Sequence, residues 1–267
     1  MRIWIVGVGN LGTAIVRSLI ASQHPADAIT LIERNPADRK LLEEQFRCEV
    51  FGEIPTGTTL GPGDVMLLAI KPQDAAVSCP ALATALHPES IVLSVIAGVP
   101  TKKLSGWLDH AKIVRSMPNL GASINESATA YFPTHDVTES DVVRIERIIS
   151  AMGKGWRVDD ESLIDVATAV AGSGPAYVCW LAEQVEQVAV ELGISPKDAH
   201  AIVLQTFRGA LLYLEHSRLS FAELREKVTS PHGTTAAALT ILSRSQADLV
   251  VQAAIKAALK RAQELGA

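Results

Sequence analysis

A glycine-rich turn directly follows the first apolar run of the chain, Ile3–Val6, and it narrows the choice of fold at once. The turn reads Gly7-Val8-Gly9-Asn10-Leu11-Gly12. In dinucleotide-binding sheets, Gly7 would permit the tight turn, Gly9 would let a pyrophosphate approach the backbone, and Gly12 would let the helix pack closely on the sheet. Glycine-rich turns also serve as ordinary connections. Here a strand-like run precedes the turn, and a helical pattern and a second strand-like run follow it, so we predict a dinucleotide site.

Short apolar runs alternate with helical patterns through residues 1–159, which we expect to form the dinucleotide-binding domain. The strand-like runs are Ile3–Val6, Ala28–Glu33, Val65–Ile70, Ile91–Ile96, Ile113–Met117, Ser127–Phe132 and Trp156–Val158. The helical patterns are Ala14–Ser22, Pro36–Arg47, Gln73–Leu86 and Glu139–Met152, with Thr138 as the N-cap of the last. Continuous apolar strands alternating with helices are typical of a parallel sheet covered on both faces. The expected fold class is therefore α/β, beginning with a Rossmann-type doubly wound sheet.

The pattern changes in residues 160–267, which we expect to form an all-α C-terminal domain. Apolar residues recur there at helical spacing in Val178–Leu192, Pro196–Leu214, Phe221–Val228 and Leu249–Leu265. These helices contain more alanine, valine and leucine than would fit on the single buried face of each of a few isolated helices. The excess indicates either an ordinary helical core or an interface with a second copy, because obligate interfaces resemble a core cut in half.

Composition excludes several other classes of protein. The chain of 267 residues has a net charge of −5, only 4% aromatic residues and no basic block, so we expect no nucleic-acid partner. Its three scattered cysteines favour a reducing cytoplasm over a disulfide framework, and its seven histidines lack metal-ligand spacing. No run reaches the roughly 20 apolar residues of a membrane span. We therefore expect a cytoplasmic protein with no membrane anchor and no metal site.

Two neighbouring residues at the end of the second strand-like run bear on the choice of cofactor. Glu33 lies where an acidic side chain binds the ribose hydroxyls of NAD, whereas Arg34 could pair with the 2′-phosphate of NADP. The carboxylate would repel that phosphate, so charge alone leans slightly to NAD. Both residues could instead belong to a solvated turn. The reduced cofactor is thus expected to be NADP or NAD.

Further candidate cofactor residues follow the later strands, whose carboxyl ends should form the cofactor crevice. Lys71 could reach a ribose or a phosphate, the small residues Ala97 and Gly98 would leave room for the nicotinamide, and Asn119 could bond its carboxamide or ribose. A surface cation and a turn-forming asparagine are the plainer interpretations. The complete expected set is Gly7, Gly9, Asn10, Leu11, Gly12, Glu33, Arg34, Ala69, Ile70, Lys71, Pro72, Ala97, Gly98 and Asn119.

The loop Ser230–Thr235 in the second half reads as an anion-binding turn. Proline and glycine open a helix at Thr234, which exposes backbone N–H groups, and nearby hydroxyls add donors. A loop of this kind can also serve only as a helix cap.

Seven blocks occur in a particular order along the chain. They are Gly7–Gly12, Ala69-Ile70-Lys71-Pro72, Val95–Val99, Arg115-Ser116-Met117-Pro118-Asn119, Gly172-Ser173-Gly174-Pro175-Ala176-Tyr177, Gln205-Thr206 and Ser230-Pro231-His232-Gly233-Thr234-Thr235. In this order and spacing the chain resembles the pyrroline-5-carboxylate reductase family over nearly its whole length. The resemblance implies a dinucleotide-binding domain followed by a helical dimerisation domain, with dimers able to assemble further.

The resemblance also implies a reaction and its residues. Hydride would pass from NAD(P)H to the C=N carbon of 1-pyrroline-5-carboxylate, a small cyclic imino acid, giving L-proline. The substrate carboxylate would be held by Ser230, Gly233, Thr234 and Thr235, and the Thr168 hydroxyl would lie near the imine nitrogen; Thr168 could instead be a β-branched core residue. No general acid stands out, which suits reduction of an iminium that already carries its proton.

Three departures from the family pattern keep other functions open. Leu120-Gly121 stand where the family usually has Thr-Pro, Ala171 where it has serine, and His232 where it has glycine. The alternatives are a reductase of a related cyclic imino acid or imine, and a non-catalytic dinucleotide-binding regulatory protein.

Overall fold

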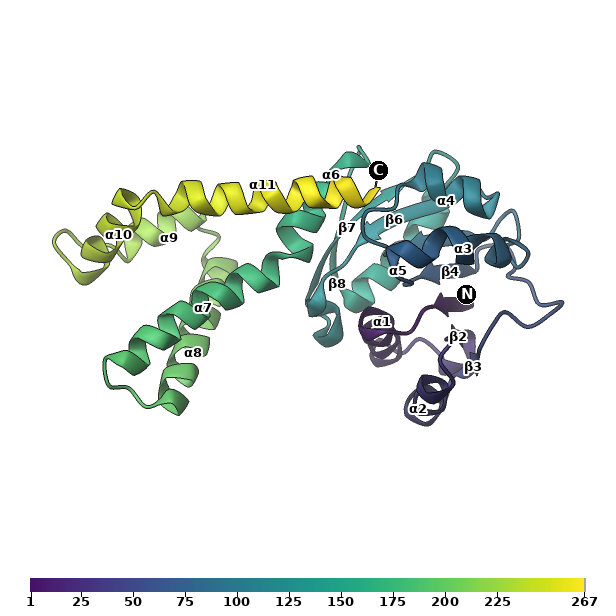
Figure 1. Ribbon diagram of the computed structural model, residues 1–267, viewed down its shortest axis with the longest axis horizontal. Coiled ribbons are helices and arrows are strands. Elements are labelled where there is room, and N and C mark those ends of the chain that lie inside the picture. The colour runs from purple at the N-terminus through teal and green to yellow at the C-terminus, as the bar shows by residue number, and fades with distance from the viewer. Residues whose placement is uncertain (267) are drawn as a thin grey trace. The chain divides into compact units, whose positions relative to one another are not determined.

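The computed structural model describes residues 1–266 (Figure 1). They form two compact units: the first holds residues 1–173 together with the segment from Ala258 onward, and the second is Gly174–Ala257. The domain boundary between residues 159 and 160 stays a prediction.

The first unit is built around one sheet of eight strands (Figure 1). The strands are β1 (Ile3–Val6), β2 (Ile29–Ile32), β3 (Glu49–Phe51), β4 (Val65–Leu68), β5 (Ile91–Ser94), β6 (Ile113–Met117), β7 (Ser127–Pro133) and β8 (Gly153–Arg157). Their order across the sheet is β3-β2-β1-β4-β5-β6-β7-β8. The chain moves outward from β1 to β3 and then returns to start again at β4. This reversal between β1 and β4 is where doubly wound sheets bind ligands, at the carboxyl ends of the strands.

The sheet is mostly parallel, as expected, with one antiparallel pair. Strands β1 to β6 pair in parallel, but β7 runs antiparallel to β6, and β8 pairs parallel with β7. Only a short connection with the 3-10 helix η2 (Leu120–Ile124) joins β6 to β7. A parallel crossover needs a dozen or more residues, so the chain can only turn back beside β6.

Helices cover both faces of the sheet, and each face has its own apolar core. On one face, α1 (Asn10–Ala21), α2 (Pro36–Phe46) and α5 (Glu139–Met152) pack over residues such as Ile5 and Leu67. On the other, α3 (Pro72–Ala83) and α4 (Thr101–Leu108) pack over residues such as Met66 and Val92. Strands buried on both faces explain the continuous apolar runs in the sequence.

Local signals explain which elements the sequence located well. Helix α5 has the expected bounds, and Thr138 forms a capping box with Asp141 at its start. Strand β8 begins at Gly153 rather than at the expected Trp156. Strand β3 and helix α4 were not predicted. The first has only three residues, and the second has only eight, so neither offers enough periods for a clear pattern.

The second half of the chain is helical, as expected. Its helices are α6 (Ser162–Ala167), the π-helix Thr168–Gly172, α7 (Gly174–Glu191), α8 (Pro196–Ser217), α9 (Phe221–Lys227), α10 (Thr234–Arg244) and α11 (Ala247–Gly266). The first two belong to the first unit, and α11 begins in the second unit and ends in the first. The fold class, a Rossmann-type sheet followed by helices, is confirmed. Within residues 1–266, none of the helices is both long enough and apolar enough to cross a membrane.

Candidate active site

A cavity of about 830 Å³ opens at the carboxyl ends of β1, β2 and β4. Seven of the expected cofactor residues line it: Gly7, Gly9, Glu33, Arg34, Ala69, Ile70 and Lys71. This volume lies within the range of ordinary small-molecule sites.

The geometry of the glycine turn matches the separate needs of its three glycines. Gly7 has a φ of +86°, and a Cβ there would lie 2.8 Å from Cγ2 of Ile70, so both backbone and space exclude a larger residue. A Cβ on Gly12 would lie 2.3 Å from the carbonyl oxygen of Gly7. A Cβ on Gly9, by contrast, would meet nothing within 4 Å. The turn is thus closed on its sheet side and open at Gly9.

Helix α1 begins at Asn10 with no side-chain cap. Its N-cap is Gly9, and no side chain bonds the first N–H groups. These groups have no acceptor within the helix, and the helix dipole adds partial positive charge beside them. The start of α1 therefore leaves N–H donors available to an anion.

Glu33 binds the backbone of its own chain. Its Oε2 accepts from the N–H of Val8 at 2.9 Å, and its Oε1 accepts from the N–H of Asn35 at 3.0 Å. The carboxylate therefore joins the end of β2 to the glycine turn. Each oxygen keeps a lone pair, so a further donor can still approach.

Arg34 and Lys71 bring positive charge to the cavity wall. The guanidinium of Arg34 is 71% exposed and pairs loosely with Asp74 at 3.3 Å. Lys71 stands just before α3, where Pro72 occupies the first helical turn. An exposed ion pair of this length contributes little to stability, so Arg34 can change partner at small cost.

A loop that the sequence did not single out forms much of the remaining wall. It follows β3 and comprises Gly52, Glu53, Ile54, Pro55, Thr56, Gly57, Thr58 and Thr59. Asp38 of α2 and Asp74, Ser78, Ala81 and Leu82 of α3 also line the cavity. The only local signal was a stretch rich in glycine, proline and threonine, which by itself indicates a loop rather than a site.

The other seven expected cofactor residues are not among those that line the cavity: Asn10, Leu11, Gly12, Pro72, Ala97, Gly98 and Asn119. Gly98 has a φ of +75° and faces the last turn of α11, where its Cβ would lie 2.7 Å from Cβ of Leu265. Asn119 donates from Nδ2 to the carbonyl of Ala171 at 3.0 Å and accepts at Oδ1 from the N–H of Gly121.

Thr168 opens the π-helix. Its hydroxyl donates to the carbonyl of Ile164 at 2.8 Å, and the N–H of Ser173 bonds the carbonyl of Thr168 at 2.9 Å. The second bond spans five residues, which widens the helix; such π-helical turns are frequent at functional sites. Because its proton is used locally, the Thr168 hydroxyl presents lone pairs to any further partner.

The Ser230–Thr235 loop lies in the second unit and is a tight turn. The N–H of Gly233 bonds the carbonyl of Ser230 at 3.0 Å, with Pro231 and His232 between them. His232 has a φ of +62°, a region that glycine adopts without strain. Helix α10 begins at Thr234 with Gly233 as its N-cap and no side-chain cap, so its first N–H groups lack side-chain partners. The turn therefore provides the donors that an anion requires.

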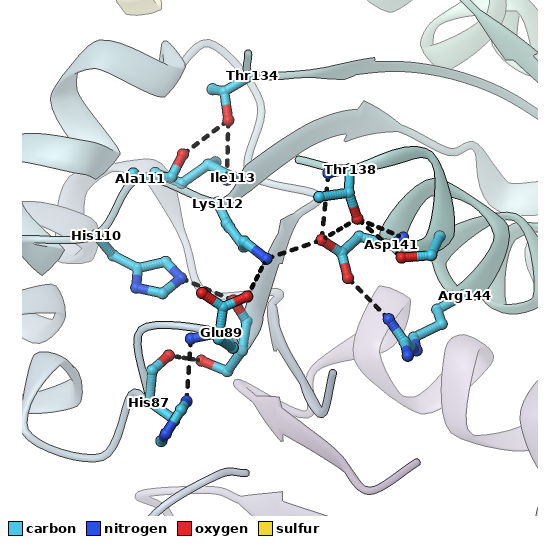
Figure 2. A network of polar contacts seen from close by, with 12 residues as sticks. His87, Glu89, His110, Ala111, Lys112, Ile113, Thr134, Thr138, Asp141 and Arg144 are labelled. Carbon is cyan, nitrogen blue, oxygen red and sulfur yellow. Dashed lines mark hydrogen bonds and ion pairs between the residues drawn. The ribbon is translucent and has the colours of Figure 1, made fainter. Parts of the chain in front are cut away.

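A polar network lies at the other end of the strands, before β5 and β6 (Figure 2). Lys112 Nζ donates to Glu89 at 2.6 Å and to Asp141 at 3.1 Å, and the bond to Glu89 raises the pKa of Lys112. Burial alone would raise the pKa of Asp141, but hydrogen bonds from Thr138 and Lys112 outweigh it and hold that pKa below the ordinary value. This network is remote from the cavity because parallel strands place their two ends on opposite edges of the sheet. Within the described range 1–266 no group of His, Cys, Asp and Glu residues is arranged to hold a metal ion.

Comparison with known proteins places both halves of the chain. Residues 161–265 match the family described as pyrroline-5-carboxylate reductase dimerisation, and residues 2–98 match NADP oxidoreductase, coenzyme F420-dependent. The pyrroline-5-carboxylate reductase of Pseudomonas aeruginosa is 34% identical over 265 residues, which cover 99% of this chain and 96% of that protein. Pyrroline-5-carboxylate reductase 1 of Bacillus subtilis is 32% identical over 99% of this chain and 89% of its own length.

Solved structures agree over the full length. A pyrroline-5-carboxylate reductase from Coxiella burnetii superposes with a TM-score of 0.91 at 31% identity, covering 100% of this chain and 98% of that one. The Plasmodium falciparum pyrroline carboxylate reductase with NADP bound shares the fold, with a TM-score of 0.86 at 22% identity over 100% of this chain and 98% of that one. The chain belongs to the pyrroline-5-carboxylate reductase family.

Proposed function

We propose that this protein reduces 1-pyrroline-5-carboxylate to L-proline with NADPH or NADH. The single observation that supports this most is family membership over nearly the whole chain, at 34% identity with a named reductase. Both parts that the reaction needs, a dinucleotide cavity and an anion-binding turn, lie within the matched length.

The cavity fits a dinucleotide. Open space at Gly9 lets a pyrophosphate approach the backbone, and the uncapped start of α1 supplies donors and partial positive charge. When bound, the reduced nicotinamide supplies the hydride that adds to the C=N carbon. The expected residues Asn10, Leu11 and Gly12 contribute backbone N–H groups and close helix packing.

Glu33 and Arg34 set the preference between the two cofactors in this proposal. Glu33 already binds two backbone N–H groups, so it acts first as a brace on the glycine turn. The exposed guanidinium of Arg34 can leave Asp74 for a 2′-phosphate. Arg34→Ala should therefore lower kcat/KM for NADPH more than for NADH; an equal loss for both would remove Arg34 from cofactor choice.

The substrate end needs acceptors for an iminium N–H and donors for a carboxylate. The Thr168 hydroxyl, which gives its proton to Ile164, has lone pairs for the iminium. The turn formed by Ser230, Gly233, Thr234 and Thr235 has donors for the carboxylate. Protonation of the imine before reduction makes the carbon a better hydride acceptor, so the residues mainly position the substrate.

We further propose a cytoplasmic homodimer formed by the helical domain, residues 160–267. The matched family model concerns dimerisation. A reducing compartment suits the three free thiols, of which Cys79 is buried with its pKa raised by burial to about 11. A thiol with this pKa is protonated and unreactive at neutral pH.

A steady-state assay tests the function directly. Purified protein with the imine should oxidise NADPH or NADH and yield proline in equal amount, and no oxidation with either cofactor would contradict the proposal. Cyclic imino acids of other ring sizes, motivated by Leu120, Ala171 and His232, belong in the same assay. A higher kcat/KM for one of them would name a different substrate, and cofactor binding without any turnover would indicate a regulatory protein.

A further inference from the structure

One face of β6 meets the segment that carries Thr168. Alternate residues of a strand point to the same face, so Arg115 and Met117 form a row on β6, and Asn119 follows in extended backbone just beyond the end of the strand. Arg115 binds Asp165 on α6, and Asn119 binds the carbonyl of Ala171 in the π-helix. Between them, a Cβ on Gly172 would lie 3.0 Å from Cε of Met117. Arg115, Met117 and Asn119 thus all contact α6 or the π-helix.

The charged end of this row is buried and holds three elements together. The Arg115 side chain is only 3% exposed; its Nη2 lies 2.5 Å from Asp165 and its Nη1 lies 3.3 Å from Glu161. Glu161 also accepts from the backbone N–H and the hydroxyl of Thr101 at the start of α4, each at 2.7 Å. Arginine therefore joins β6 to the residues just before and within α6, and through Glu161 to α4.

Stability alone explains this cluster poorly. Nε of Arg115 is buried without a hydrogen-bond partner in the described chain, which costs free energy. Buried ion pairs are weak evidence for stability, because desolvation offsets much of the attraction. The planar guanidinium of Arg115, with one nitrogen on Asp165 and the other on Glu161, does fix the positions of its partners closely. Asp165 lies three residues before Thr168, so it sits about one helical turn from that hydroxyl on the same side of the helix.

We propose that Arg115, Glu161 and Asp165 are positioning residues that hold the π-helix Thr168–Gly172, and with it the Thr168 hydroxyl, in the place required for imine reduction. This proposal rests on the proposed role of Thr168. A misplacement of about 1 Å by a distant change can cost about 100-fold in rate, so the cluster can control turnover without touching substrate.

The test compares Asp165→Asn with Asp141→Asn. Both changes remove a carboxylate from a buried cation, Arg115 in one case and Lys112 in the other (Figure 2). We expect both variants to fold, with modest and similar falls in Tm. Only Asp165→Asn should lower kcat, by about 10- to 100-fold, while KM for the imine and the Kd for NADPH in a binding titration change less than about twofold. Equal kcat in the two variants would overturn the proposal.

Arginine chemistry offers a second comparison. Arg115→Lys keeps the charge but loses the two-pronged geometry, so its kcat should fall between those of the wild type and Arg115→Met. A lysine variant as fast as the wild type would contradict positioning by this geometry. A methionine variant as fast as the wild type would contradict any role for the cluster.

Hydrogen exchange separates this proposal from the proposed function. The amide of Ser173, which bonds the carbonyl of Thr168, should exchange about tenfold faster in Asp165→Asn and at the wild-type rate in Asp141→Asn. This measurement needs no turnover. Unchanged exchange at Ser173 overturns the positioning role even in an active enzyme, whereas an inactive wild type with the expected exchange pattern rejects only the reaction.

Discussion

The apolar side chains of the first unit are buried in its own core, whereas those on the helices of the second unit are mostly exposed. Two apolar clusters fill the two faces of the sheet. Helices α7, α9 and α10 have no buried residue, and α8 has only Ala199 and Val203. Each large apolar side chain left in water forgoes about 1.5–3 kcal/mol. The sheet unit can thus be stabilised by its own core, while the helical unit needs an external partner surface.

Helix α7 shows this need most clearly. Val178, Leu181, Val185 and Val188 follow one another at spacings of three and four residues and so lie along one stripe of the helix. All four are exposed, by 45–51% of their surface. In the first unit Val77 is exposed too, at 80%, but stands alone on α3. A stripe can pair with another helix, whereas a single exposed valine is normal on a protein surface.

The largest expected effect comes from a charge in this stripe. Val185→Asp would place an unpaired carboxylate in the proposed dimer interface, at a cost of about 3–5 kcal/mol. We expect the dimer Kd to rise more than about 100-fold by light scattering, with turnover lost in parallel. Val77→Asp is the matched control and should remain dimeric and active. A dimeric Val185→Asp variant would show that this stripe faces water.

The second expected effect concerns the point within the first unit where the end of α11 packs against Gly98. Gly98 has a left-handed backbone, and the Cβ of Gly98→Ala would lie 2.7 Å from that of Leu265. Gly57 has a similar backbone, with a φ of +78°, but the Cβ of Gly57→Ala would meet nothing within 4 Å. The backbone cost of about 1–2 kcal/mol is shared, so the difference measures the contact with α11. We expect Gly98→Ala to be less stable than Gly57→Ala by about 1–3 kcal/mol in denaturant titrations. Equal stabilities would mean that the end of α11 moves away from the new methyl group at no cost in free energy.

The sequence located the glycine turn because its signal is local. Gly7, Gly9 and Gly12 lie within six residues, and each has a separate steric reason to be glycine. Thr138 and Asp141 likewise mark the start of α5 by themselves. Elements and residues with such nearby causes were predicted with nearly the right bounds.

What the sequence could not locate depends on distant residues. The loop after β3 lines the cavity only because β3 pairs with β2, and three residues such as Glu49–Phe51 carry no pattern of their own. The contact of Gly98 with Leu265, far along the chain, likewise has no local signal, and the expected place of Gly98 beside the nicotinamide stays a prediction. The binding roles of Glu33, Asn119, Thr168 and the Ser230–Thr235 loop stay predictions.

A third prediction tests dinucleotide binding at the glycine turn of the first unit, which has its own apolar core. Gly9→Ala meets nothing within 4 Å, so Tm should not fall, but the new methyl group would obstruct a bound pyrophosphate. We expect the Kd for NADPH to rise about tenfold, which corresponds to about 1.4 kcal/mol. Gly106→Ala, at an exposed position of helix α4, also meets nothing within 4 Å and should bind normally with a slightly higher Tm. Unchanged affinity in Gly9→Ala would place the pyrophosphate elsewhere.

The smallest expected effect is a difference in how the two units respond to acid. The pKa of Asp141 is held below its usual 3.8 despite burial, by Thr138 and Lys112, so its contribution to stability is present above that value and is lost as pH falls through the lowered pKa. Asp141→Asn should be less stable than the wild type at pH 7, and the gap should narrow below about pH 4. The loss stays small because Lys112 keeps Glu89. In the helical unit, Glu186→Gln removes only an exposed pair with His200 and should change neither stability nor its pH slope. Denaturant titrations between pH 3 and 7 would measure both variants, and a constant gap for Asp141→Asn would mean that this carboxylate is not stabilised by the fold.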